Sequence, residues 1–453
     1  MKVVKFGGSS LASGEQFKKV ARIVFSDKDR RIVVVSAPGK RSAEDIKTTD
    51  LLISLAKEVV GGKEYKGALE LVIRRFADIV EELDLGIELL TGIENRLIEL
   101  INMYRYDEDR LLDALKSSGE NQNAKLVAAY FNKRGEEAHY VSPKEAGLLV
   151  TDAPGNARIL PEAYEQLTKL RDRSGILVIP GFFGYSKVGN IVTFPRGGSD
   201  ITGSIVAAGV EADLYENFTD VSSIYSVNPT LVENPHEMKE ITYKEMRELS
   251  YSGFSVFHDE ALQPVVNKKI PVRIKNTNDP DALGTKIVSD RVQEGFPVVG
   301  IASDEGFCSI NLTKYLMNRQ VGFGRHLLEI LEREEISFEH TPSGIDNMSV
   351  IVRSHHLENG KEERILHRIR TELDVEDVDV ERNLAMVMVV GEGMAKTVGV
   401  ASRATTALSN AGVNIKMINQ GSSEVSMMFG VDADKADLAV QSLYYAYFTP
   451  VNQ

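Results

Sequence analysis

The chain has 453 residues, of which 43% are apolar, and its 66 acidic residues outnumber 53 lysines and arginines to give a formal net charge of -13. This length is typical of about three globular domains, and the negative charge disfavours binding to nucleic acid or to an anionic membrane surface. That charge leaves small molecules or further copies of the chain as the expected partners. A single cysteine, Cys308, and the lack of an apolar run near the roughly 18 residues that span a bilayer indicate a cytoplasmic protein.

The first predicted strand, residues 3–6, carries Lys5 and ends in the turn Gly7-Gly8-Ser9. Glycines let the backbone approach a ligand closely and present N–H groups beside the lysine charge, which is phosphate-binding chemistry. An ordinary strand followed by a glycine turn is the structural alternative.

A helix is predicted over residues 15–25 and a β-branched strand over 31–36, which together indicate a parallel sheet. Ser36 ends the second strand, and the carboxyl ends of parallel strands are where such sheets bind ligands. Thr49 then precedes a long helical region.

Residues 51–115 repeat apolar side chains at helical spacing, which predicts a core rather than a cofactor site. The stretch 117–120 is predicted to break this region, and residues 123–131 to resume the helical pattern. Glu120 follows a glycine in the break, and a carboxylate that begins a helix is its structural alternative.

A second glycine pair, Gly197-Gly198, opens a predicted helix and is flanked by Arg196, Ser199 and Asp200. Two glycine pairs, each beside a basic residue and a hydroxyl group, are not expected to occur in one sheet by chance, and they indicate anion binding. The alternatives are a surface ion pair for Arg196 and a helix-start carboxylate for Asp200.

The first domain is predicted to continue with a strand over residues 214–219, which ends in Thr219-Asp220. A short strand over 270–274 is predicted to be its last strand, and the domain is expected to end near residue 290.

The tail contains an internal repeat at an offset of 77 residues, which places Gly322 on Gly399 and Gly344 on Gly421 without a gap. Each copy is predicted to be a helix, a β-branched strand, a glycine turn and a second strand, which indicates two small α+β domains. Chance similarity of two amphipathic segments is the alternative.

Together these features resemble the aspartokinases (aspartate kinases) over the whole chain. The motifs that carry the resemblance are Lys5-Phe-Gly-Gly-Ser-Ser, Ser118-Gly-Glu120, Arg196-Gly-Gly-Ser-Asp200, Thr219-Asp220 and Ile418-Asn-Gln-Gly-Ser422. The resemblance implies an α/β amino acid kinase fold, a mostly parallel sheet sandwiched by helices, followed by two α+β ACT domains. It places the kinase domain at 1–290, the first ACT domain at 305–383 and the second, discontinuous one at 297–304 plus 384–453.

The activity that the resemblance implies is ATP-dependent phosphorylation of the L-aspartate β-carboxylate to 4-phospho-L-aspartate, the first step toward lysine, threonine and methionine. ATP with Mg²⁺ is the implied cofactor, and no metal ligand is assigned to a protein side chain. A carboxylate is already an anionic nucleophile, so the reaction needs cations and amide dipoles rather than a general base.

By the same resemblance, Lys5 neutralises the transferring phosphoryl group beside Gly7, Gly8 and Ser9, and Asp200 organises Lys5. The substrate-binding residues implied are Ser36, Thr49, Glu120, Arg196, Gly197, Gly198 and Ser199, with Arg196 holding the α-carboxylate and Glu120 the ammonium group.

The nucleotide-binding residues implied are Lys5, Gly7, Gly8 and Ser9, which line the phosphates, together with Thr219, Asp220, Tyr225, Thr230 and Ser255. Thr230 and Ser255 stand where many family members have an arginine and a lysine. We therefore keep two alternatives to an active aspartate kinase: an amino acid sensor with a weakened kinase domain, and a kinase for another amino acid.

The resemblance also implies feedback control by lysine or threonine, or both, in a homodimer or homotetramer that assembles through the ACT domains. The effector-binding residues implied are Met317, Phe323, Gly324, Ser337, Phe338, Glu339, Asp346 and Asn347. Core packing is the alternative for Met317 and Phe323, because both side chains are apolar.

Overall fold

The structure is a computed structural model that describes every residue except 196, 255–256, 258, 293–294, 424 and 450–453. The chain forms two compact units. The first comprises Met1–Ile224, Glu237–Arg247 and Ser255–Arg291, and the second comprises Tyr225–His236, Glu248–Phe254 and Val292–Gln453.

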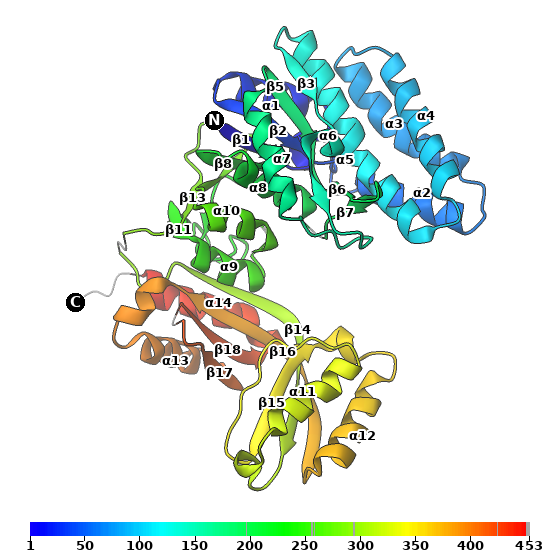
Figure 1. Ribbon diagram of the computed structural model, residues 1–453. Helices are drawn as coiled ribbons and strands as arrows, with labels where there is room; N and C mark the ends of the chain where they lie inside the picture. Colours follow the sequence, from blue (N-terminus) through cyan, green and yellow to red (C-terminus); the bar gives the residue numbers. More distant parts are fainter. Residues whose placement is uncertain (196, 255–256, 258, 293–294, 424, 450–453) are drawn as a thin grey trace. The chain divides into compact units, whose positions relative to one another are not determined.

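An eight-stranded sheet forms the centre of the first unit, in the order β11-β13-β12-β8-β1-β2-β5-β3 (Figure 1). β13 runs antiparallel to β12, and all other neighbours in the sheet are parallel. The strands are β1 (Lys2–Phe6), β2 (Arg30–Val35), β3 (Ala138–Tyr140), β5 (Ile176–Pro180), β8 (Leu214–Thr219), β11 (Glu240–Thr242), β12 (Val272–Asn276) and β13 (Thr285–Val288).

A smaller three-stranded sheet in the same unit has the order β4-β6-β7. Its strands are β4 (Leu149–Val150), β6 (Phe183–Ser186) and β7 (Ile191–Thr193), and the short strands β9 (Ile224–Tyr225) and β10 (Glu237–Met238) lie outside it.

Helices cover both faces of the large sheet, because alternate side chains of each strand point to opposite faces. On the face of Phe6, α1 and α5 meet where Phe25 and Phe131 pack edge to face, with ring centroids 5.0 Å apart. On the face of Lys5, α8 packs closely against Tyr215 of β8. The helices are α1 (Gly14–Phe25), α2 (Thr48–Val60), α3 (Lys66–Glu82), α4 (Glu88–Tyr104), α5 (Glu108–Lys133), α6 (Pro143–Ala146), α7 (Glu162–Thr168), α8 (Gly198–Gly209) and α10 (Leu262–Lys268).

The second unit is built on a five-stranded antiparallel sheet in the order β15-β14-β16-β18-β17. Its strands are β14 (Gly300–Thr313), β15 (Asn347–Arg353), β16 (Asp377–Val390), β17 (Met417–Gln420) and β18 (Ser426–Asp432). Its helices are α11 (Phe323–Arg333), α12 (Lys361–Leu373), α13 (Val400–Asn410) and α14 (Ala436–Phe448), while α9 (Tyr243–Tyr251) contributes residues to both units.

Two separate apolar cores lie along this sheet. Residues 300–304 of β14 pair with 386–390 of β16 beside the core of α13 and α14, whereas residues 307–313 pair with 377–384 beside the core of α11 and α12. The register shifts between Asp304 and Phe307, where β14 passes from one core to the other.

The elements predicted around the two glycine turns are confirmed: β1 and α1 flank the first turn, α8 follows the second, and the strands predicted at 31–36 and 214–219 are β2 and β8. The internal repeat is confirmed for its helices, since α11 and α13 both begin after a left-handed glycine, Gly322 (φ 83°) and Gly399 (φ 87°). In the first copy, however, the strand predicted next forms only isolated bridges, such as His340 with Ile351. Pro342 lacks the N–H group that a continuous ladder needs.

The predicted break at 117–120 is wrong, because α5 runs without interruption from Glu108 to Lys133. Ser117 and Ser118 donate their hydroxyl hydrogens to the carbonyl oxygen of Ala114 inside the helix, each at 2.9 Å. A Cβ at Gly119 would lie 2.8 Å from the Cβ of Ala37, so the glycine permits a close approach between α5 and the loop after β2.

The strand predicted over residues 270–274 is confirmed as β12, but it is not the last strand of the domain, because β13 follows and pairs antiparallel with it. Gly284, directly before β13, has φ at 70°, and a Cβ there would lie 2.0 Å from the Ile274 carbonyl oxygen. Among the helices that the structure describes, none is long and apolar enough to cross a membrane.

The contact at Gly119 predicts opposite effects of two glycine-to-alanine changes. Gly119→Ala should destabilise the protein by about 1–2 kcal/mol, because overpacking against Ala37 outweighs the gain in helix propensity. Gly92→Ala in α4 should instead stabilise it by about 0.5–1 kcal/mol, since nothing lies within 4 Å of the added methyl group. Urea unfolding followed by circular dichroism measures both, and equal effects would contradict the packing role of Gly119.

Candidate active site

The turn after β1 and the loop after β2 lie against each other at the carboxyl ends of the two strands. The Gly39 amide donates to the Gly8 carbonyl oxygen at 2.8 Å. A Cβ on Gly39 would lie 2.5 Å from the Gly8 carbonyl carbon, and a Cβ on Gly8 would lie 3.1 Å from the Ala37 carbonyl oxygen. Only glycines allow this contact, which places both loops beside one cavity.

Lys5 forms a buried ion pair with Asp200, at 2.6 Å between Nζ and Oδ1. The two side chains are 8% and 18% exposed, and Asn217 of β8 donates its side-chain amide to the same Asp200 oxygen at 2.8 Å. Asp200 lies in the first turn of α8, and Lys5 and Asn217 are register partners on neighbouring strands. Contacts among β1, α8 and β8 therefore fix the position of the lysine ammonium. The ammonium also lies near Gly7, because a Cβ built on Gly7 would be 3.5 Å from Lys5 Nζ.

Glu120 of α5 is a buried carboxyl group, only 5% exposed. Burial raises the pKa of Glu120 to about 8, although the backbone of Ala37, the Ser199 hydroxyl and the Lys5 charge each oppose that shift. Its Oε2 atom has no hydrogen-bond partner among the described residues. A buried carboxyl oxygen without a partner is well suited to accept a hydrogen bond from a ligand ammonium group.

The start of α8 brings the second glycine pair to the same region. Gly197 adopts the left-handed conformation with φ at 78°, and a Cβ on Gly198 would lie 2.5 Å from the Phe182 ring. Ser199 packs on the backbone of Gly181, where a Cβ would come within 2.8 Å of the Ser199 side chain. Arg196 lies outside the described residues.

A cavity of about 480 Å³ joins several of these groups, and we call it the active-site cavity. It brings together the predicted residues Gly8, Ser9, Ser36, Thr49, Glu120 and Asp220. Lys40 and Lys47 also line it and were not among the predicted site residues. The position of Lys40 directly after the Gly39 turn was the sequence signal for it, whereas Lys47 lies in a charged loop without a motif.

The predicted nucleotide-binding residues are divided. Thr219 is the last residue of β8 and Asp220 follows it, and the Thr219 hydroxyl donates to the Asp220 carboxylate at 3.1 Å. Tyr225 and Thr230 belong to the second unit, where Thr230 lines a cavity of about 240 Å³ together with Asn228 and Phe254. Ser255 lies outside the described residues.

The predicted effector residues all lie near α11 and β15 of the second unit, but their environments differ. Met317 and Phe323 are 7% and 4% exposed and belong to the core of α11 and α12. Their positions therefore agree with the alternative that these two side chains pack in the core. Ser337 and the 46%-exposed Phe338 line an open hollow beside α11. Glu339 lies 3.5 Å from the Arg353 guanidinium.

The remaining effector positions stay predictions. The Asp346 carboxylate accepts a hydrogen bond from the Leu316 amide at 2.8 Å, and the Asn347 carbonyl oxygen accepts one from the Gly344 amide at 2.8 Å. A Cβ on Gly324 would be in van der Waals contact with the Met348 side chain, at 3.8 Å. In the part of the chain that the structure describes, no group of three or more histidine, cysteine or acidic side chains could hold a metal ion.

Comparisons with known proteins agree on one family. The amino acid kinase family model matches residues 1–276, and an ACT domain model matches residues 387–447. Aspartokinase 3 of Bacillus subtilis strain 168 is 56% identical over 451 residues, which cover 100% of this chain and 99% of that protein.

Solved structures of similar proteins cover almost the whole chain. The aspartate kinase of Clostridium acetobutylicum, described as an allosteric enzyme, superposes with a TM-score of 0.87 at 40% identity over 99% of this chain and 100% of that one. Aspartokinase III of E. coli in complex with aspartate and ADP has a TM-score of 0.82 at 26% identity over 99% and 100% of the two chains. Its complex with lysine and aspartate has a TM-score of 0.77 at 26% identity, with 99% of each chain covered.

The buried state of Glu120 predicts a pH dependence of stability in the ligand-free protein. The folded-state pKa of about 8 exceeds the ordinary value of 4.5, so the folded state binds the extra proton and stability falls as the pH rises between these values. Relative to Glu120→Gln, the wild-type protein should lose up to about 1 kcal/mol of unfolding free energy per pH unit.

Urea unfolding at about pH 5.5 and about pH 7.5 measures this slope. Glu94→Gln, an exposed carboxylate on α4, is the control and should retain the wild-type slope. If Glu120→Gln also kept the wild-type slope, Glu120 would not be the group that holds the proton.

Proposed function

Because the chain belongs to the amino acid kinase family and, within it, to the aspartate kinases, we propose that ATP phosphorylates L-aspartate in the active-site cavity of the first unit. Two groups carry this assignment to particular residues: the Lys5 ammonium, which is fixed by Asp200, and the unpartnered carboxyl oxygen of Glu120, on which the Lys5 charge acts. One group suits a phosphate and the other suits an amino group.

In the reaction, an oxygen of the aspartate β-carboxylate forms a bond to the γ-phosphorus of ATP, and the bond from that phosphorus to the bridging oxygen of ADP breaks. The nucleophile carries its own negative charge and needs no general base. Catalysis therefore depends on neutralising the charge that spreads over the transferring oxygens. We assign this task to Lys5, supported by the backbone N–H groups of the Gly7–Ser9 turn.

The Lys5 ammonium is held in place rather than free to follow the substrate. Asp200 and Asn217 fix its position, so no reorganisation is needed when the phosphoryl group moves. Lys40 and Lys47, which line the same cavity, add positive charge that can hold the phosphates of the nucleotide.

Aspartate is held by its charged groups. Glu120 accepts the ammonium group, Ser199 lies beside it, and Arg196 takes the α-carboxylate in the way that the family resemblance implies. Ser36 and Thr49 line the same cavity. This arrangement leaves the β-carboxylate to point toward Lys5.

The nucleotide binds with Mg²⁺ in this proposal. Magnesium is commonly held by one or two carboxylates together with substrate phosphates, and Asp220 supplies a carboxylate in the cavity. When bound, the ion neutralises phosphate charge. We place Thr219 and Asp220 on the nucleotide side and retain Tyr225, Thr230 and Ser255 there as predictions from the resemblance.

We also propose that lysine is the feedback effector, because the similar E. coli enzyme forms a complex with lysine and aspartate. Its site would lie at the ACT domains of a homodimer or homotetramer, with Glu339 as the partner of an effector ammonium group. The domain bounds proposed are 1–290, 305–383 and 297–304 plus 384–453.

Removing the Lys5 charge tests the catalytic assignment. Lys5→Met should lower kcat for ADP release with aspartate by about 100-fold or more, because one fixed donor at the transferring phosphoryl group is lost. Lys63→Met, an exposed lysine between α2 and α3, is the matched control and should be as active as wild type. Glutamate in place of aspartate should give much slower ADP release.

Wild-type turnover by Lys5→Met would remove the assignment, and faster turnover of glutamate would favour a kinase for another amino acid. Circular dichroism confirms that each variant is folded before its rate is compared.

Calorimetry tests the effector. Lysine should bind to the full-length protein with an affinity that depends on aspartate, and threonine should give less heat. Glu339→Gln should weaken lysine binding by about tenfold, since it removes the charge that faces the ammonium group. The exposed carboxylate variant Glu363→Gln should bind lysine as wild type does, and an absence of heat with either amino acid would contradict regulation at this site.

A further inference from the structure

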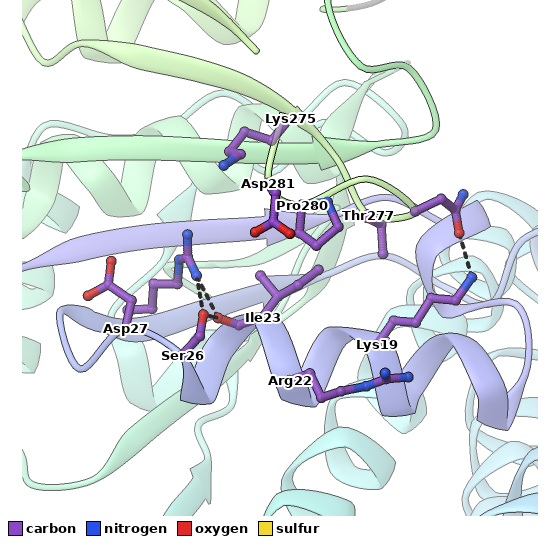
Figure 2. A pocket seen from close by; sticks show the side chains of 11 residues that line it. Lys19, Arg22, Ile23, Ser26, Asp27, Lys275, Thr277, Pro280 and Asp281 are labelled. Carbon is purple, nitrogen blue, oxygen red and sulfur yellow. Dashed lines mark hydrogen bonds between the residues drawn. The ribbon is translucent and has the colours of Figure 1, made fainter. Parts of the chain in front are cut away.

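A second pocket of the first unit, of about 600 Å³, lies between α1 and the chain that follows β12, and we call it the α1 pocket. Figure 2 shows Arg22 and Ile23 of α1, with Ser26 directly after this helix, on one wall, and Lys275, Pro280 and Asp281 on the opposite wall. None of its lining residues belongs to the active-site cavity. The mechanism proposed above makes no use of it.

Lys275 is the most unusual group in this pocket. It is only 9% exposed, and its ammonium lies 6.0 Å from the centroid of the Phe218 ring. It forms no ion pair or hydrogen bond with any residue that the structure describes, and burial lowers its pKa. A buried cation without a partner is costly, and an anion bound beside it would remove that cost.

The other charges of the pocket leave an excess of positive charge. Arg30 is paired with Glu216 at 2.7 Å, and Asp27 is paired with Lys2 at 2.5 Å, so these four groups cancel. The remaining charges that line the pocket are three cations, Lys19, Arg22 and Lys275, and one carboxylate, Asp281. Lys19 donates to the neutral side chain of Asn278 at 2.7 Å and keeps its charge uncompensated (Figure 2).

The excess of two positive charges stands out in a chain with a net charge of -13. A phosphate monoester carries between about 1.5 and 2 negative charges at neutral pH, which would balance the excess positive charge of the pocket. Ile23 and Pro280 add apolar surface to the same pocket. We propose that the α1 pocket binds a small organic phosphate, with the phosphate at Lys275 and the organic part on Ile23 and Pro280.

A hydrogen bond links the pocket to the segment that follows the strand of Lys5. Thr277 lines the pocket, and its hydroxyl oxygen lies 2.7 Å from that of Ser10, which follows Ser9. A ligand in the α1 pocket therefore lies one hydrogen bond away from the Gly7–Ser9 turn.

Calorimetry with phenyl phosphate tests the proposal. The full-length protein is first saturated with aspartate and ADP, so that the active-site cavity is filled and binding there does not contribute heat. We expect one site for phenyl phosphate, weaker binding of inorganic phosphate, and a loss of affinity of about tenfold or more in Lys275→Met. The exposed Arg22→Ala should weaken binding several-fold without a risk to folding.

Lys28→Ala is the matched control, because Lys28 is an exposed cation near α1 that does not line the pocket. It should bind phenyl phosphate as wild type does. An absence of heat at millimolar phenyl phosphate, or equal affinity of wild type, Lys275→Met and Arg22→Ala, would overturn the proposal. Equal affinity for phenyl phosphate and inorganic phosphate would overturn the role of Ile23 and Pro280.

Discussion

The ion pair between Lys5 and Asp200 is the interaction on which the rest of the first unit depends. It joins β1 to the first turn of α8, and Asn217 of β8 completes the link. Pairing a buried ammonium in this way offsets the cost of keeping a full charge inside the protein. The pair also explains why α8 must begin where it does, since one turn of displacement would separate Asp200 from Lys5.

A second constraint is steric. Gly8 and Gly39 bring two loops into backbone contact, and Gly119 brings α5 against the loop after β2. These close approaches place the Glu120 carboxyl in the cavity that the two loops line. The glycines of this unit therefore act as much through the distance between elements as through the turns they permit.

Much of this arrangement was predictable from the sequence, because β1 and β2 are rich in β-branched residues and both glycine turns stand at element ends. The continuity of α5 was not, since Ser117, Ser118 and Gly119 have weak helix propensity and their place in a helix depends on tertiary contacts. The pairing of Lys5 with Asp200 was implied only by the family resemblance, and the structure confirms it. Lys47 lies in a loop without a pattern, and only the folded chain shows that it lines the cavity.

The raised pKa of Glu120 has a consequence for how the enzyme takes up its substrate. In the empty cavity at neutral pH this group holds its proton, yet only the ionised form can neutralise an incoming ammonium group. In the proposed binding mode, substrate capture is an exchange in which a hydrogen ion leaves the protein as the amino acid enters. The apparent affinity for the amino acid would then rise as the pH rises toward the pKa of Glu120, and acidification would weaken this step.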